Sequence, residues 1–262
     1  MQKRAITRQQ ADNFIKFLGT AGARFVMIRQ LRSSAGLWIK GGGVNLLVDP
    51  GPGCLVKCNS SRPRLELNKL EAIILTHCHL DHSNDLNVMI EAMTEGGFKK
   101  RGAVFLPTDC LKQESILLPY AKNFPERIET LKEFTKYHVG NFDFEVGPRN
   151  LHPVETYGLK FKINNTIVSL IGDTAFYPNL LKFYSADVLI INVVFFEPRA
   201  DIEHLSFEDA KHLIKELQPK KAVLTHFGMT MLKAKPHQLA ADLSKELKID
   251  IVAAYDGMTL NF

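Results

Sequence analysis

The chain has 262 residues, of which 45% are hydrophobic and 23% are charged, values that exclude a disordered or fibrous protein. No apolar run approaches the roughly 20 residues that cross a bilayer, and residues 1–10 lack the apolar stretch of a secretory signal, so we expect a cytoplasmic protein without a membrane segment. The formal net charge of +5 only weakly favours anionic substrates or nucleic acid, and four cysteines are too few for a disulfide framework.

The chain alternates between apolar runs of strand length and segments with helical spacing, which is typical of an α/β protein. Three glycines at 41–43 separate two apolar runs and predict a hairpin turn, and Ser206 is expected to cap a helix. Strands are predicted at 14–18, 36–40, 44–49, 70–75, 142–146, 157–163, 166–171, 188–194, 222–224 and 249–254. Helices are predicted at 84–94, after Asp173, at 207–217 and at 237–247, and the region 111–136 is predicted to be helical with breaks at Pro119 and Pro125.

The two halves of the chain repeat one pattern. The apolar strand that ends at Asp49 is echoed by the strand that leads to Asp173, and the run 71–77, which ends in Thr-His, is echoed by 221–226. The spacing from Asp to His is 28 residues in the first half and 53 in the second, so the second half carries an insertion. We expect a single α/β domain over residues 1–262, built as a four-layer αββα sandwich with a site at the shared strand ends.

Four ligand-type side chains lie within six residues, directly after a predicted strand: His77, His79, Asp81 and His82. Imidazole nitrogen and carboxylate oxygen suit zinc, manganese or iron. In a tight loop, alternating histidines can converge on one ion while the next two residues point to a neighbouring position. Without a metal, four such groups at a buried strand end would be costly to desolvate. The segment therefore predicts a metal site.

This His-x-His-x-Asp-His segment resembles the hallmark of the metallo-β-lactamase superfamily, and further pieces match in order along nearly the whole chain. The resemblance implies two divalent metal ions, with zinc expected and manganese or iron fitting the same ligands. It also implies that Asp49 orients the ligands from behind. By the same analogy, the first metal takes His77, His79, His152 and Asp173, and the second takes Asp81, His82, Asp173 and His226.

Such a metal pair can ionise a shared water, and the resulting hydroxide attacks phosphodiesters, thioesters, lactones or β-lactams. A bridging Asp173 rather than a cysteine argues against the true class B β-lactamases. The runs 17–24 and 32–34 are similar to the opening of the tRNase Z branch of the superfamily. His204-Leu205-Ser206, a following helix and 224–227 resemble the His-x-Thr motif and zinc histidine that this branch shares with the phosphodiesterase of the carbon–phosphorus lyase pathway. Asp81 and His204 are thus the expected catalytic residues, with His204 as a proton donor to the leaving oxygen or a stabiliser of the transition state.

Several alternatives remain open. No long arm for gripping tRNA is recognisable between Asp85 and His152 or in 156–172, so a small or nucleotide-like phosphodiester is favoured over RNA as the substrate. The segment 172–176 also resembles the glyoxalase II group, which makes a thioesterase or lactonase a competing prediction. A factor that mainly captures RNA is a further class, although no dense basic stripe interleaved with aromatics is present. A homodimer is a further expectation, since dimers are common among such relatives.

The remaining cysteines and histidines match no motif. Cys54 and Cys58 are expected to be free thiols in a loop, because no second pair of Cys or His lies close by in the sequence to complete a structural metal site. His138, His212 and His237 are assigned to the surface or the core.

Overall fold

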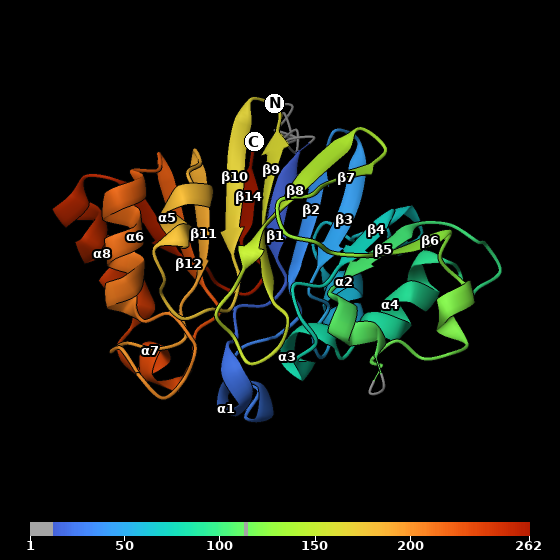
Figure 1. Cartoon of the computed structure of the whole chain (residues 1–262), viewed down its shortest axis with the longest axis horizontal. Helices are drawn as coiled ribbons and strands as arrows, with labels where there is room; N and C mark the ends of the chain where they lie inside the picture. Colours follow the sequence, from blue (N-terminus) through green and yellow to red (C-terminus); the bar gives the residue numbers. More distant parts are fainter. Residues whose placement is uncertain (1–12, 113–114) are drawn as a thin grey trace, which may run out of the picture.

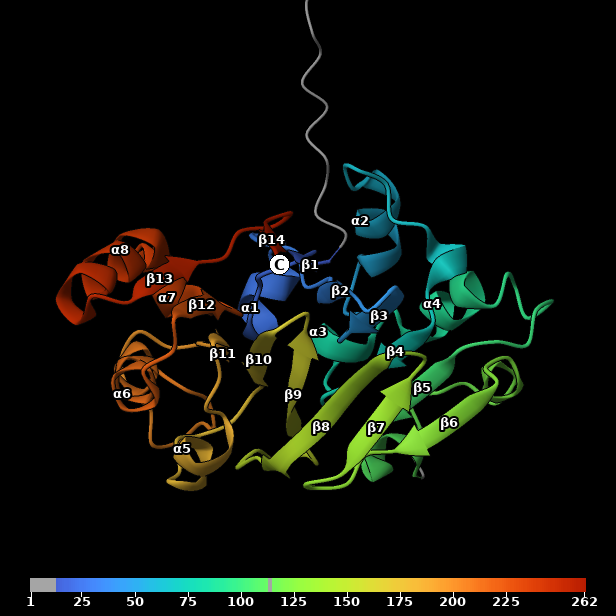
Figure 2. The same ribbon diagram turned by 90° about the horizontal axis from the view of Figure 1, so that it is seen from above.

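The computed structural model describes residues 13–112 and 115–262, and residues 1–10, on which the expected absence of a secretory signal rests, lie outside that part. Two seven-stranded sheets pack face to face, and helices cover the outer face of each (Figure 1, Figure 2). The predicted α/β class and four-layer αββα sandwich are confirmed.

The first sheet has the strand order β14-β1-β2-β3-β4-β5-β6. Its early strands pair antiparallel, and the glycine turn joins β2 to β3 as predicted, whereas β3, β4, β5 and β6 run parallel. Because carboxyl ends of parallel strands lie at one edge, the loops after β3 and β4 open side by side. The strands are β14 (Thr259–Asn261), β1 (Phe14–Phe17), β2 (Leu37–Gly41), β3 (Val44–Val48), β4 (Ala72–Ile74), β5 (Ala103–Leu106) and β6 (Arg127–Thr130).

The second sheet repeats this plan in the order β13-β12-β11-β10-β9-β8-β7. An antiparallel hairpin of β9 and β10 is followed by β11, β12 and β13, all parallel to β10. The strands are β7 (Lys136–Val139), β8 (Phe142–Arg149), β9 (Tyr157–Ile163), β10 (Thr166–Ile171), β11 (Val188–Asn192), β12 (Lys221–Thr225) and β13 (Asp250–Ala253).

The helices pack against the outer faces through apolar stripes. On the first sheet, Leu86, Met89, Ile90 and Met93 of α4 are fully buried in one outer core. On the second, Leu213 and Ile214 of α6 lie in the other, and a central core fills the space between the sheets. The helices are α1 (Ala23–Ile28), α2 (Cys54–Ser60), α3 (Leu80–Ser83), α4 (Leu86–Met93), α5 (Asn179–Phe183), α6 (Phe207–Leu217), α7 (Met229–Lys233) and α8 (Pro236–Leu247), with short 3₁₀ turns η1 (Leu67–Lys69), η2 (Thr108–Leu111) and η3 (Ala121–Asn123).

Among the described residues, no helix combines the length and apolar character needed to cross a bilayer.

The helical prediction for 111–136 is wrong in its described part, which forms 3₁₀ turns and the edge strand β6. Pro119 and Pro125 interrupt any longer helix, and pairing with β5 then selects an extended edge strand. Cys54 and Cys58 lie in α2 rather than in a loop, as buried free thiols with their Sγ atoms 3.9 Å apart.

Candidate metal centre

The candidate residues come from loops at one edge of both sheets. Asp49 directly follows β3, and the segment from His77 to His82 follows β4, with Asp81 and His82 in α3. From the second sheet, His152 follows β8, Asp173 follows β10 and His226 follows β12. Asp49 and His226 both have a positive φ, of 53° and 60°, which turns the chain sharply at the strand end. The structure thus brings all seven predicted ligand residues together.

Three histidines form the first group of potential ligand atoms. His79 Nδ1 lies 3.1 Å from His77 Nε2 and 3.1 Å from His152 Nε2. His77 is fully buried, and His152 is 9% exposed. Four ligands bound tetrahedrally to zinc at 2.0–2.1 Å lie about 3.3 Å from each other. The spacing of these nitrogens therefore fits ligands of a single zinc-sized ion.

A second group joins Asp81, His82 and His226 beside the first. His82 Nε2 lies 3.3 Å from His226 Nε2, and Asp81 Oδ2 lies 3.8 Å and 3.7 Å from the same two nitrogens. Asp173 stands between the groups, since its Oδ2 is 3.9 Å from His77 Nε2, 3.5 Å from His82 Nε2 and 3.3 Å from His226 Nε2. One carboxylate oxygen therefore faces both groups.

Hydrogen bonds from behind fix which nitrogen each imidazole offers to the centre. His82 Nδ1 donates to Asp49 Oδ2 at 2.9 Å, and His152 Nδ1 donates to the carbonyl of Glu203 at 3.0 Å. The Thr76 hydroxyl donates to Asp49 Oδ2 at 2.7 Å, so its oxygen accepts from His77 Nδ1 at 3.0 Å. When neutral, each of the three histidines therefore presents an unprotonated Nε2 to the centre, which is the form that binds a metal.

Burial and neighbouring charges shift the pKa values of these groups. Burial lowers the pKa of His77, His79 and His152. Burial also opposes charge on His82, but Asp173, Asp49 and Asp81 together raise its pKa well above the usual value. Burial alone would raise the pKa of Asp173 and neutralise it. The imidazoles around it, His226 first, instead hold its pKa well below the usual range. His77, His79 and His152 thus favour the neutral form that binds a metal, whereas the carboxylates around His82 favour a positive charge at the centre.

His204 reaches the same centre from the segment before α6. Its Nδ1 lies 3.6 Å from Asp173 Oδ2, and its ring centre lies 5.0 Å from that of His152. The predicted N-cap is confirmed, because Ser206 Oγ accepts from the backbone N–H of Asp209 and the Asp209 carboxylate accepts from the Ser206 N–H. This capping box fixes the start of the helix two residues after His204.

Asn192 was not predicted as a functional residue, although it interrupts the apolar run of β11. Its Nδ2 donates to Asp173 Oδ1 at 2.8 Å, which leaves Oδ2 to face the two ligand groups. The remaining histidines contact other surroundings: the His138 Nδ1 pairs with Asp143 at an exposed edge, and the His212 ring packs on Phe176. His237 lies on α8. A polar residue at the end of a buried strand is the pattern that could have identified Asn192.

Comparison with known proteins agrees with this geometry. A family model described as a β-lactamase superfamily domain matches residues 44–227. An uncharacterized protein of Methanocaldococcus jannaschii, MJ1374, is 29% identical over 255 residues, which cover 93% of each chain. The probable metallo-hydrolase YhfI of Bacillus subtilis is 25% identical over 206 residues, 74% of this chain and 80% of that protein.

Solved structures share the fold over nearly the whole chain. The crystal structure of YhfI superposes with a TM-score of 0.78 at 21% identity, covering 95% of this chain and 98% of that one. A diphosphatase of the PhnP family superposes with a TM-score of 0.70 at 18% identity, covering 95% and 97%. The matched residues include strands of both sheets and every candidate ligand. The chain therefore belongs to the metallo-β-lactamase superfamily of hydrolases.

Proposed function

We propose that this protein is a phosphodiesterase that uses two divalent metal ions, zinc by preference, and acts on a small or nucleotide-like phosphodiester. His77, His79, His152 and Asp173 would hold the first ion, and Asp81, His82, Asp173 and His226 the second. When bound, the ions supply Lewis acidity and a nucleophilic hydroxide at neutral pH. The observation that carries the two-ion proposal is the position of Asp173 Oδ2, which lies within 4 Å of nitrogens from both groups.

The proposed reaction assigns separate roles to the carboxylates. Asp173 is fully buried by its neighbours and held by Asn192, so it keeps its charge and position while the substrate exchanges. Asp81 is half-buried in α3 and shares no protein hydrogen bond with the histidines, so it is the more adaptable of the two and the proposed catalytic carboxylate.

His204 favours phosphodiesters over thioesters. Hydrolysis of a phosphodiester releases an alkoxide, a poor leaving group whose departure is helped by protonation. Hydrolysis of a thioester releases a thiolate, which departs without a proton. His204 is mostly buried, and its Nδ1 lies 3.6 Å from Asp173 Oδ2. We assign His204 the role of proton donor to the leaving oxygen. The competing assignment is a metal ligand, because His204, His152 and Asp173 also form a compact group.

A single variant separates these roles. His204→Ala should retain its metal content and lose at least 100-fold in turnover of a dinucleotide, a phosphodiester with an alkoxide leaving group, the range expected when a general acid is removed. Bis(p-nitrophenyl) phosphate should lose much less, because its nitrophenolate leaves without a proton. His212→Ala, on the exposed side of α6, is the matched control and should keep both its metal content and its turnover. Loss of one metal equivalent from His204→Ala would make it a ligand, and unchanged turnover of the dinucleotide would remove its catalytic role. Faster hydrolysis of a glutathione thioester than of the phosphodiester would favour the thioesterase alternative.

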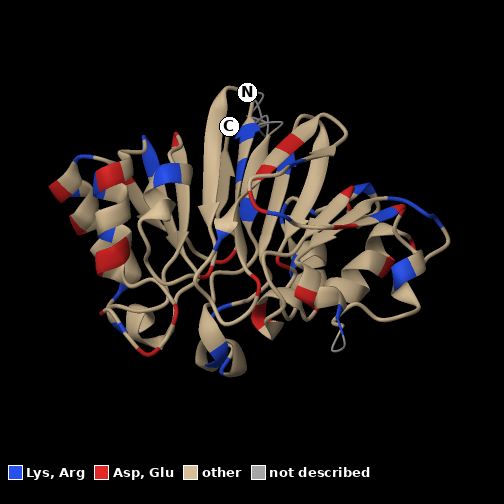
Figure 3. Cartoon of the chain, viewed as in Figure 1, with Lys and Arg blue, Asp and Glu red and all other residues tan. Residues whose placement is uncertain are grey.

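RNA is the less favoured substrate. Figure 3 shows basic and acidic residues interspersed along the helices and sheets of the described chain. The described residues between Asp85 and His152 are taken up by α4, β5, β6, β7, β8 and short turns, and β9 and β10 form a compact hairpin. Binding of tRNA that weakens steeply with salt would favour the ribonuclease alternative. A single domain over 1–262 and a homodimer remain predictions, and limited proteolysis and light scattering would test them.

A further inference from the structure

Of the four imidazoles that direct Nε2 to the proposed centre, one differs from the others in what lies behind it. His77, His82 and His152 each use Nδ1 to contact a protein oxygen, on Thr76, Asp49 and Glu203 respectively. His226 directs Nε2 to the centre in the same way. Within residues 13–112 and 115–262, however, no protein atom forms a hydrogen bond with its Nδ1. A metal-binding histidine nearly always donates its second ring N–H, so this nitrogen needs a partner.

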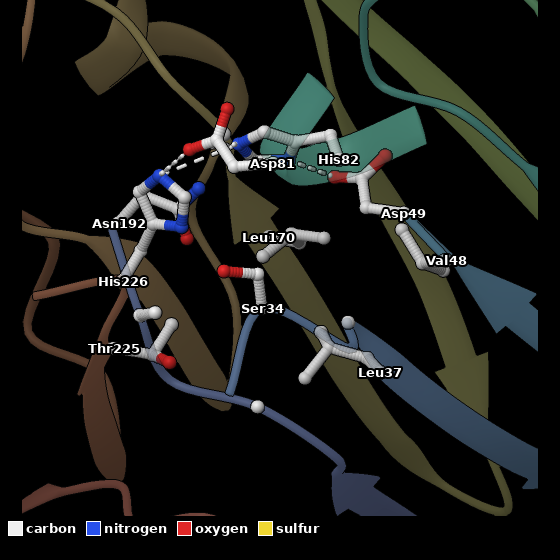
Figure 4. A pocket seen from close by; sticks show the side chains of 14 residues that line it. Ser34, Leu37, Val48, Asp49, Asp81, His82, Leu170, Asn192, Thr225 and His226 are labelled. Atoms are coloured by element: carbon white, nitrogen blue, oxygen red, sulfur yellow. Dashed lines mark hydrogen bonds and ion pairs between the residues drawn. The ribbon is translucent and has the colours of Figure 1, made fainter. Parts of the chain in front are cut away.

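The environment of the His226 ring restricts where that partner can be. A Cβ built on Gly22 would lie 2.8 Å from His226 Cδ2 and 2.1 Å from its carbonyl oxygen. Backbone therefore covers the Cδ2 edge of the ring, and Nδ1 lies on the opposite edge. Figure 4 shows this nitrogen facing a pocket beneath the centre.

That pocket is small and polar on the side of the ring. Its volume is about 40 Å³, and a water molecule needs about 10–15 Å³ by the same kind of measure. Its lining includes Ser34, Asp49, Leu170, Asn192, Thr225 and His226. Ser34 is 6% exposed, its Oγ has no partner among the described residues, and Figure 4 shows this oxygen pointing into the pocket toward His226. An orphan hydroxyl and an orphan imidazole nitrogen thus face one space that fits water.

We propose that this pocket is a built water site, in which a buried water accepts a hydrogen bond from His226 Nδ1–H and is held by Ser34 Oγ. Asn192 supplies the remaining acceptor through its amide oxygen, while its Nδ2 donates one N–H to Asp173 Oδ1. The water then fixes the tautomer of His226 and connects it through Asn192 to Asp173. Ser34 is a positioning residue that acts through this water. The inference rests on the proposed function only for its effect on metal affinity.

Threonine and valine at position 34 provide a matched pair, since they have nearly the same shape but only threonine keeps the hydroxyl. In the metal-free protein, nitrogen-15 NMR should show His226 protonated at Nδ1 in the wild type and in Ser34→Thr, with a cross-peak from this proton to a long-lived water. Ser34→Val should lose the cross-peak and bind its second zinc about tenfold more weakly, the effect of losing an outer partner. Ser169→Ala is the control, because Ser169 Oγ is also buried and unpartnered among the described residues but does not line the pocket.

The two readouts separate the two proposals. If the wild-type cross-peak is present but no zinc binds, the water site holds and the proposed function fails. If Ser34→Val and Ser34→Thr behave alike in both measurements, or if the Nδ1 proton contacts a protein atom directly, the water site is refuted whatever the metal content. A wild-type crystal structure with ordered water between Ser34 Oγ and His226 Nδ1 would support it independently.

Discussion

Asp49→Asn tests how far one residue outside the proposed ligand set controls the centre. Asp49 Oδ1 accepts from the Thr76 N–H at 2.7 Å, and Oδ2 accepts from both the Thr76 hydroxyl and His82 Nδ1. Asparagine tolerates the positive φ at this position, so the fold should survive. With its oxygen kept on the Thr76 N–H, the new NH₂ would take the place of Oδ2.

That exchange reverses the direction of two hydrogen bonds. An NH₂ facing His82 Nδ1 disfavours a proton on that nitrogen. The NH₂ also donates to the Thr76 hydroxyl, which must then donate to His77 Nδ1. Both imidazoles are pushed to the tautomer that is protonated at Nε2, the atom that faces the centre. Since the loss of one such outer partner costs about 10–100-fold in metal affinity, or about 1.4–2.7 kcal/mol, we expect each proposed metal site to weaken by about this factor.

The assay is a competition titration of zinc against a chromophoric chelator, with thermal unfolding of the metal-free protein in parallel. Asp256→Asn is the matched control, because Asp256 also accepts from a threonine hydroxyl, on Thr20, and from a backbone N–H, on Ser33, and no histidine bonds to it. Asp256→Asn should lose some stability and keep its zinc affinity. If Asp49→Asn binds both zinc ions within threefold of the wild type, the argument from hydrogen-bond direction is wrong.

Two further variants test how the surrounding loops position the site. Gly22→Ala places a methyl group against the His226 carbonyl and ring, so it should cost about 1–3 kcal/mol of stability and weaken zinc binding. The control is Gly43→Ala, where a Cβ meets no atom within 4 Å, and it should leave zinc affinity unchanged. Ser206→Ala removes the capping box of α6, so it should cost about 0.5–2 kcal/mol of stability, measured by thermal unfolding. It should also lower turnover without loss of metal. Turnover equal to that of the wild type would show that the start of α6 does not position His204.

The sequence predicted the central strands and the candidate ligands for the same physical reason. Apolar runs such as 157–163 and 166–171 are long enough to show strand character by themselves, and the polar residues that follow them stand out. The strands β6, β7 and β14 were missed because they are short, partly exposed edge strands, which only pairing with a neighbour distinguishes from a loop. The four-residue β5 was missed because it is too short to show a period.

Outer contacts of the centre could not be predicted from spacing. The carbonyl of Glu203 lies 51 residues from His152, and Ser34, proposed to act through a water, lies far along the chain from His226. The carbonyl carries no residue identity, and a serine in a loop is common. Such groups become recognisable only when the fold places them within hydrogen-bond distance, whereas four ligand-type residues within six positions are visible in the sequence itself.

The repeat of the two halves holds, but it equates different strands from those that the sequence pattern matched. The similarity of 71–77 to 221–226 makes β12 the counterpart of β4. In the sheets, however, the counterpart of β4 is β11, because each is the first strand that runs parallel to the hairpin of its half. The contacts follow the sheets: Thr76, after β4, binds Asp49, and Asn192, at the end of β11, binds Asp173. Each half thus anchors its carboxylate with a polar residue from the next parallel strand. Because β11 is the counterpart of β4, the longer Asp-to-His spacing of the second half means that His226 follows β12, one strand further along its sheet than His77 in the first half. From there its Nε2 lies 3.3 Å from Nε2 of His82, which comes from the other half.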